Sequence, residues 1–401
     1  MTVFLIATLD TKGLEAQFVR DFLKTAGVKV TLVDTGCLGQ PQVSADITRE
    51  AVFAAAGTSL EAVKAQSDRG FAVTTAARGV TAIVQKVHQT GDLQGVFSLG
   101  GSAGTTIGTA AMRCLPMGIP KLMVSTLASG DVRAFVGVRD ILMMNSIVDI
   151  AGLNHISRTV LREAAAAMVG MVNASSLVPS NDDRPIIAAT MFGVTTPCVE
   201  QARQVLETAG YEVLVFHATG TGGQAMEELI NDGMIAGVLD ITTTEIADEV
   251  VGGMLSAGPL RLTAAGARGI PQVVSVGATD MVNFWAMSSV PVRFQNRQLY
   301  QHNENVTLMR TTPAECRQIG EQIANKLNAA VGPVRILLPL QGVSAIDREG
   351  EPFDDRTARS ELFNAIRLGI DGPTIVELDQ HINDERFAVT AAETLIELMT
   401  K

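Results

Sequence analysis

Glycines and hydroxyl residues cluster directly after one short apolar run, Gly95–Leu99. The chain there reads Gly100-Gly101-Ser102-Ala103-Gly104-Thr105-Thr106, and a helical pattern follows over Thr105–Cys114. Glycines let backbone N–H groups approach an anion closely, and the start of a helix carries partial positive charge. The turn therefore predicts a site for phosphate or another anion, with a tight strand–helix turn that binds nothing as the alternative. It is not a Walker A loop, because no G-x-x-x-x-G-K-[ST] occurs.

A second polar turn follows the first apolar run of the chain, Val3–Leu9. Its residues are Thr8-Leu9-Asp10-Thr11-Lys12-Gly13. The two threonines offer hydrogen bonds to a nucleotide, Lys12 offers charge to a phosphate, and Asp10 offers a carboxylate to Mg²⁺ through water. The competing interpretation is an Asp helix cap beside a solvated lysine.

Two further loops complete the predicted pocket, because ligands of open parallel sheets bind at the carboxyl ends of the strands. One follows the strand predicted at Lys121–Ser125, and the other precedes the long helix predicted at His155–Val172. Either Asp10 or Asp149 would position Mg²⁺ or a ribose, and the sequence leaves both open. The residues predicted to hold ATP are Thr8, Asp10, Thr11, Lys12, Gly100, Gly101, Ser102, Gly104, Thr105, Thr126, Ala128, Ser129, Gly130, Asp149, Gly152 and Asn154.

The C-terminal half carries its own glycine turn, His217–Gln224, after the strand predicted at Glu212–Phe216. It is a second candidate anion site, against a plain turn, and its histidine lies where a general acid or base is useful. Other polar residues follow later strands, although each also suits a helix cap or a solvated loop. The candidate catalytic residues are His217, Glu245, Asp280, His302, Arg310 and Asp347; no spacing among them is diagnostic for a metal.

The elements that must position these loops alternate between short apolar runs and amphipathic segments, which is typical of parallel βαβ units. The fold class predicted is α/β, with two Rossmann-like domains, each a mostly parallel sheet flanked by helices. The polar stretch Ser175–Arg184 is the predicted boundary, between an N-terminal nucleotide-binding domain (1–178) and a C-terminal domain (185–401). Helices are predicted at Gly13–Ala26, Ile47–Gln66, Phe71–Val87, Thr196–Ala209, Ala225–Asn231 and Glu385–Thr400, with later strands at Ile336–Leu338 and Thr374–Leu378.

Three short matches recur in the same order in both halves, which indicates a duplicated unit. They pair Ile6-Ala7-Thr8 with Ala188-Ala189-Thr190, Gly95-Val96-Phe97 with Gly237-Val238-Leu239, and Gly118-Ile119-Pro120 with Gly269-Ile270-Pro271. The first half is longer between its first two matches, over Gln40–Arg69.

Composition limits the classes of partner. The 401 residues carry a formal net charge of -11, which argues against broad binding to nucleic acid or anionic membranes. Cys37, Cys114, Cys198 and Cys316 form no C-x-x-C pair, so we expect reduced thiols and a cytoplasmic protein. No apolar run reaches the length of a membrane span without a polar break.

Seven stretches resemble the UPF0261 family, also called Tm-1-like ATP-binding proteins. They lie in order along nearly the whole chain: Ile6–Gly13, Leu99–Thr105, Val124–Asp131, His217–Gly223, Asp240–Glu245, His302–Thr311 and Leu338–Ser344. The resemblance implies two Rossmann-like domains, ATP with Mg²⁺ on the N-terminal one, and a homodimer. It assigns no reaction.

Two functions therefore remain open beyond ATP binding at the Gly100–Thr105 turn. The chain is either an enzyme that acts on a small metabolite in a cleft between its domains, or a nucleotide-controlled regulatory or protein-binding module without turnover of its own. A Rossmann dehydrogenase is disfavoured, because Asp10-Thr11-Lys12-Gly13 follows the first strand in place of G-x-G-x-x-G.

Overall fold

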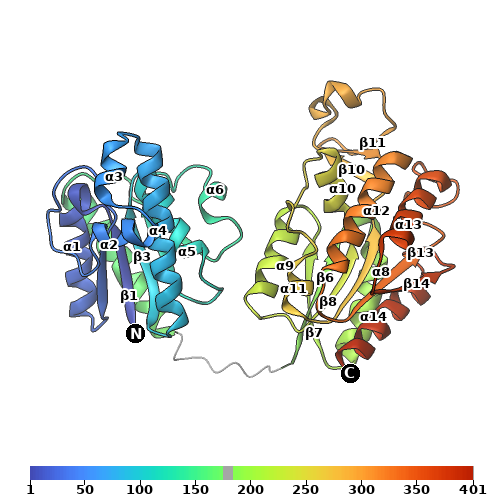
Figure 1. The fold of residues 1–401 in the computed structure, drawn as a ribbon, viewed down its shortest axis with the longest axis horizontal. Coiled ribbons are helices and arrows are strands. Elements are labelled where there is room, and N and C mark those ends of the chain that lie inside the picture. The colour runs from blue at the N-terminus through green and yellow to red at the C-terminus, as the bar shows by residue number, and fades with distance from the viewer. Residues whose placement is uncertain (175–183, 401) are drawn as a thin grey trace. The chain divides into compact units, whose positions relative to one another are not determined.

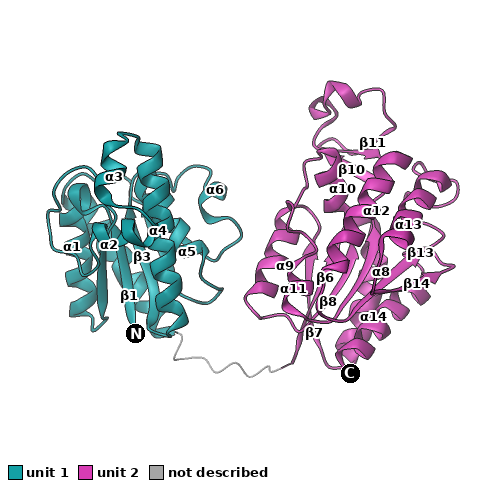
Figure 2. Ribbon diagram, in the orientation of Figure 1, with its two compact units in different colours: residues 1–181 teal, residues 182–401 magenta. Residues whose placement is uncertain are grey.

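Parallel strands alternate with helices along the chain and form two separate sheets. The computed structural model describes residues 1–174 and 184–400. The chain divides into two compact units, Met1–Asn181 (unit 1) and Asp182–Lys401 (unit 2), coloured teal and magenta in Figure 2. The boundary predicted at Ser175–Arg184 lies, apart from Arg184 itself, outside the described residues.

Unit 1 is built on a five-stranded parallel sheet with strand order β2-β1-β3-β4-β5. Helices α1 and α7 pack on one face, and α2 to α5 pack on the other (Figure 1). All six residues of β1 are buried, as in strands covered on both faces. The strands are β1 (Thr2–Ala7), β2 (Val30–Asp34), β3 (Leu93–Gly100), β4 (Lys121–Ser125) and β5 (Leu142–Asn145). The helices are α1 (Leu9–Thr25), α2 (Arg49–Ala55), α3 (Leu60–Ala65), α4 (Arg69–Gln89), α5 (Ser102–Arg113), α6 (Arg133–Val136) and α7 (His155–Ala174).

Unit 2 has a six-stranded parallel sheet with strand order β14-β13-β9-β8-β6-β7. Helices α8 and α14 cover one face, and the other helices lie on the opposite face. The strands are β6 (Ile186–Met191), β7 (Glu212–His217), β8 (Gly237–Thr242), β9 (Gln272–Gly277), β13 (Val334–Pro339) and β14 (Thr374–Leu378). The helices are α8 (Thr196–Thr208), α9 (Thr221–Asn231), α10 (Thr244–Val251), α11 (Ala264–Arg268), α12 (Pro313–Asn328), α13 (Arg356–Gly369) and α14 (Glu385–Met399).

The two sheets share one topology. In chain order, the first five parallel strands of unit 2 are arranged second-first-third-fourth-fifth, as are the five strands of unit 1. This shared order supports the interpretation of the chain as a duplicated unit. In both, the strand order reverses beside the first strand, which is where open α/β sheets leave a crevice for ligands.

A small antiparallel sheet in unit 2 has no counterpart among the elements predicted from sequence. Its order is β10 (Met281–Phe284), β12 (Val306–Arg310) and β11 (Leu299–Asn303). Residues 295–305 are rich in Gln and Asn, a composition typical of loops, yet Leu299–Asn303 form the edge strand β11. Strand β11 is mostly exposed, so its residues are largely polar and do not show the apolar pattern by which a strand is predicted.

Several helices begin earlier than their patterns predict. Helix α1 begins at Leu9 instead of Gly13, α5 at Ser102 instead of Thr105, and α9 at Thr221 instead of Ala225. In α5 and α9, glycine and hydroxyl residues that suggest a loop form the first helical turn. In α1, that turn also includes Leu9, the last residue of the predicted first apolar run. The single helix predicted over Ile47–Gln66 is two helices, α2 and α3, separated at Gly57, whose φ is +80°. Across the described part of the chain, no helix has the length and apolar character needed to span a bilayer.

Candidate functional site

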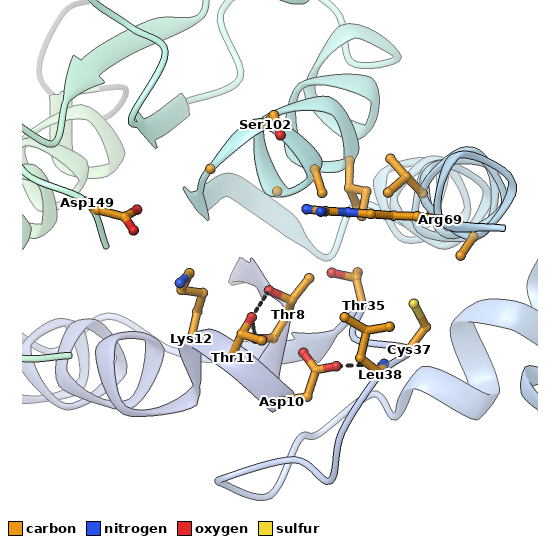
Figure 3. A pocket seen from close by; sticks show the side chains of 16 residues that line it. Thr8, Asp10, Thr11, Lys12, Thr35, Cys37, Leu38, Arg69, Ser102 and Asp149 are labelled. Atoms are coloured by element: carbon orange, nitrogen blue, oxygen red, sulfur yellow. Dashed lines mark hydrogen bonds between the residues drawn. The ribbon is translucent and has the colours of Figure 1, made fainter. Parts of the chain in front are cut away.

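A cavity of about 300 Å³ opens in unit 1 where the strand order reverses. It lies between the ends of β1 and β3, and Figure 3 shows its side chains. Ligand pockets of proteins begin at roughly this volume. The lining residues are Thr8, Asp10, Thr11, Lys12, Thr35, Cys37, Leu38, Arg69, Ala72, Val73, Gly101, Ser102, Ala103, Gly104, Ile107 and Asp149.

One wall of the cavity is the open N-terminus of α5. Gly101 caps this helix without a side chain to accept from its amides. The first intrahelical bond comes from Thr105 N to Gly101 O, at 2.8 Å. Within residues 1–174 and 184–400, the N–H groups of Ser102, Ala103 and Gly104 have no acceptor. These three amides and the helix dipole therefore offer a binding place for negative charge.

Glycine is required at this turn because strand and helix approach closely. A Cβ on Gly100 would lie 2.9 Å from the Cα of Gly104. A Cβ on Gly101, in contrast, would meet only Thr126 Oγ1, at 3.7 Å. The protein itself would accept a side chain at position 101, so its absence keeps the cavity open beside the α5 amides.

The opposite wall is the start of α1. Thr8 is the residue before this helix, and its Oγ1 lies 2.9 Å from Thr11 Oγ1. Lys12 leaves helical geometry, with φ -129° and ψ 20°, which kinks the helix. The Lys12 side chain points into the cavity (Figure 3) and forms no hydrogen bond or ion pair among the described residues.

The two carboxylates of the cavity have different surroundings. Asp10 Oδ2 accepts from the amides of Leu38 (2.8 Å) and Gly39 (3.1 Å), so it holds the loop after β2. Asp149 lies on the loop before α7, across the cavity, and in the described structure its carboxylate has no partner. Of the two carboxylates, Asp149 is therefore the one available to bind a ligand or a cation.

Half of the lining was not identified from the sequence. The missed residues come from the segment after β2, from the start of α4 and from α5 itself. The sequence feature that points to some of them is the extra length over Gln40–Arg69, because Leu38 lies just before this segment and Arg69 is its last residue. Burial and the charge of Asp10 raise the pKa of the Cys37 thiol, so it stays protonated at neutral pH. The missed residues are Thr35, Cys37, Leu38, Arg69, Ala72, Val73, Ala103 and Ile107.

Eight residues predicted to hold ATP do not line the cavity. Thr105 Oγ1 lies 2.7 Å from Ser125 Oγ in the interior, the amide of Gly152 donates to Glu15 Oε1, and Asn154 Oδ1 accepts from Ser157 N at the start of α7. These contacts give the three residues structural roles. The residues outside the lining are Gly100, Thr105, Thr126, Ala128, Ser129, Gly130, Gly152 and Asn154.

The glycine turn of unit 2 is already filled from within the protein. Glu245 Oε1 accepts from the amides of Gly220 (2.7 Å) and Gly223 (3.1 Å). Its Oε2 lies 2.6 Å from Arg261 Nε. Burial raises the pKa of the Glu245 carboxyl, against the charge of Arg261. The predicted second anion site is thus occupied by a side chain, and Glu245 serves the fold there.

Three of the other candidate catalytic residues meet in the interior of unit 2. Arg310 Nη1 donates to the backbone oxygen of Asp280 at 3.1 Å, and Arg310 Nη2 lies 3.4 Å from Asp347 Oδ1. Asp347 also pairs with Arg359 at 2.7 Å. Arg359 lines a surface cavity of about 470 Å³, but Asp280, Arg310 and Asp347 are not among the residues that line it. His217, at the end of β7, and His302, on β11, are exposed, so the six candidates do not converge on one site.

The buried carboxyl of Asp280 makes the stability of unit 2 depend on pH. Burial, reinforced by the charge of Asp347, raises the pKa of Asp280 to about 7, whereas an unfolded aspartate has about 3.9. Between these values the folded state keeps a proton that the unfolded state releases, so stability falls as pH rises from about 4 to 7. We expect Asp280→Asn to remove the share of Asp280 in this dependence, while Asp248, whose pKa burial also raises to about 7, keeps its own share. The variant should be more stable than the parent at pH 8 by about 1 kcal/mol or more.

Urea unfolding at pH 5 and pH 8, followed by the fluorescence of Trp285, measures this effect. Trp285 is the single tryptophan and lies in unit 2. Asp371→Asn, which changes an exposed carboxyl of the same unit, is the matched control. Equal stability of the parent at both pH values, or a less stable Asp280→Asn at pH 8, would contradict the assignment.

Comparison with known proteins places the chain in a family. Models of the two domains of an uncharacterised protein family, UPF0261, match residues 1–177 (N-terminal domain) and 184–399 (C-terminal domain). The chain belongs to the UPF0261 family. A UPF0261 protein of Clostridium tetani is 48% identical over 401 residues, covering 100% of this chain and 99% of the relative. A UPF0261 protein of Rhizobium meliloti is 48% identical over 97% of each chain.

A plant relative of this UPF0261 chain is much longer. The tomato (Solanum lycopersicum) protein described as ToMV resistance protein Tm-1 is 39% identical over 421 residues. The match covers 100% of this chain and 56% of the tomato protein. The UPF0261 part is therefore one portion of the plant protein.

Proposed function

We propose that unit 1 binds ATP, with the phosphates at the Gly100–Thr105 turn. The observation that carries this proposal is the set of three amides, Ser102 to Gly104, which lack acceptors in the described structure and border a cavity. Anionic groups bind at such helix starts because N–H donors and the helix dipole act together. The contrast with the glycine turn after β7 in unit 2, whose amides already donate to the Glu245 carboxylate, supports the same conclusion.

The position and shape of the cavity also suit a nucleotide. It lies at the carboxyl ends of β1 and β3, the strands beside which the order reverses. Polar groups from α1 and α5 line one part, and the side chains of Leu38, Val73 and Ile107 supply apolar surface for another. A ligand with a charged end and a flat apolar end matches this division.

The cavity suits Mg²⁺ only when phosphates accompany it. Asp10 and Asp149 are the carboxylates of the lining. Among the residues described, no group of three or more His, Cys, Asp or Glu side chains is arranged to hold a metal. Mg²⁺ commonly binds through one or two carboxylates together with phosphate oxygens and water. Asp149 would supply its free carboxylate to such an ion, and the ion would neutralise charge on the phosphates.

The arrangement favours the nucleotide-controlled module over the enzyme. The polar residues expected to act on a metabolite are dispersed in unit 2. Four of them belong to two internal ion-pair clusters, and His217 and His302 are exposed on different strands. We therefore propose that binding ATP is itself the function of the cavity, and that it regulates the chain or its interactions.

Thermal unfolding with added ligands tests the proposal. ATP with Mg²⁺ at one hundred times its dissociation constant should stabilise the protein by about 2.7 kcal/mol and raise its melting temperature. NAD and a sugar phosphate are the comparison ligands, because stabilisation by NAD alone would favour a dehydrogenase. Absence of ATP binding by calorimetry at millimolar concentration would overturn the proposal.

A further inference from the structure

Two cationic side chains approach the mouth of α5 from different walls of the cavity. Lys12 extends from the kinked start of α1, and Arg69 extends from the first residue of α4. Figure 3 shows both side chains directed into the space that Ser102 borders. In the described structure neither side chain forms a hydrogen bond or an ion pair. Both therefore remain available to a ligand.

The placement of Arg69 on α4 relates it to the apolar part of the cavity. Arg69, Ala72 and Val73 have the spacing i, i+3, i+4, so they lie on one face of the helix. All three line the cavity. A ligand that contacts Ala72 and Val73 with its apolar end and the α5 amides with its phosphate would therefore lie beside the guanidinium of Arg69.

The positions of the two cations favour several linked phosphates over one. Two carboxylates also line the cavity, so its side chains sum to no net charge and the net charge alone favours neither. One phosphate at the α5 amides would already accept hydrogen bonds from three N–H groups. Lys12 and Arg69 lie on separate walls, so only a ligand that extends past those amides would bind both side chains. Arginine suits this role because its planar donor group pairs with two oxygens at once.

We infer that the cavity selects ligands with two or more linked phosphates, and that Arg69 and Lys12 determine this selectivity. The inference rests on the proposed binding of phosphates at α5 and adds the two side chains that recognise the phosphates beyond the first. Arg69 is the last residue of the segment Gln40–Arg69, by which the first half is longer than the second. This segment therefore contributes a residue that determines ligand specificity, as well as helices α2 and α3.

Calorimetric titration of the full chain with AMP, ADP, ATP and inorganic pyrophosphate tests the inference. The parent should bind ADP and ATP at least about tenfold more tightly than AMP, because charge-assisted bonds to phosphate are among the strongest available. Arg69→Met should lose about tenfold in affinity for ADP and ATP and less than about threefold for AMP. Lys12→Met should show the same pattern.

Arg78→Met is the matched control, because Arg78 is an exposed arginine of the same helix outside the cavity lining. Its affinities should equal those of the parent. Pyrophosphate separates the sources of the linked phosphates: binding comparable to ADP assigns recognition to the phosphates alone, and weaker binding adds a contribution from the nucleoside. Equal losses for AMP and ATP in Arg69→Met would overturn the inference while leaving nucleotide binding intact. A parent that binds none of the four ligands would overturn the proposed function as well.

Discussion

Ser102→Pro should weaken ATP binding by about tenfold to a hundredfold, whereas Ser102→Ala should change it by less than about threefold. Both variants lose the hydroxyl, but only proline also removes the Ser102 N–H, one of the three amides at the α5 mouth. A hydrogen bond to a charged group contributes about 1.5–3 kcal/mol, which corresponds to this loss of affinity. The proline ring also occupies space in front of the remaining amides.

The substitution is chosen so that the helix survives it. Ser102 is the first residue of α5, the position where proline is most readily accepted, since its N–H has no partner within the helix. The preceding residue, Gly101, is extended, with φ -80° and ψ -154°, and so lies outside the α region that is disfavoured before proline. Circular dichroism and the melting temperature without ligand establish that the fold is intact. Equal ATP affinity of the two variants, measured by calorimetry, would show that the amides do not hold the ligand.

The topology and the open turn were predictable because both depend on local patterns. Short apolar runs separated by amphipathic segments specify parallel strands and covering helices, and the glycines of Gly100–Gly104 specify a close strand–helix turn. The limits of the helices were less predictable. A first turn made of Gly, Ser and Thr has low helix propensity, yet packing against the sheet stabilises it at Ser102 and at Thr221.

The sequence did not predict whether the amides of each glycine turn are free or already bonded, because this depends on a residue distant in sequence. The turns at Gly100 and Gly220 read alike, but Glu245 reaches the second one from 25 residues along the chain. Nothing in the sequence around Gly220 indicates that a carboxylate accepts hydrogen bonds from the amides of this turn. Arg69 was missed for a related reason: its place in the cavity follows from how α4 packs, and an isolated arginine at a helix start reads as a solvated side chain.

The internal carboxylate at the second turn has an energetic consequence, because Glu245 belongs to a buried ion cluster centred on Arg261. We expect Arg261→Met to lower the free energy of unfolding of unit 2 by about 3–5 kcal/mol, the usual cost of leaving buried charge without its partner. Arg261 is 1% exposed. Its guanidinium lies 2.7 Å from Asp240 Oδ1 and 2.6 Å from Glu245 Oε2, and it also pairs with Glu227. Urea unfolding followed by Trp285 fluorescence measures the loss.

The pH dependence of that loss separates unpaired charge from lost packing. Without Arg261, the folded-state pKa of Glu245 rises further, since its nearest positive charge is gone. The folded variant then binds protons that the unfolded chain releases, so its deficit relative to the parent should shrink as pH falls from 8 to 5. Arg268→Met, which makes the same change at an exposed position of α11, should alter stability by less than about 0.5 kcal/mol at either pH. A deficit of Arg261→Met that stays constant between pH 5 and 8 would mean that methionine disturbs packing instead, and that Arg261 does not neutralise the carboxylate held in the second glycine turn.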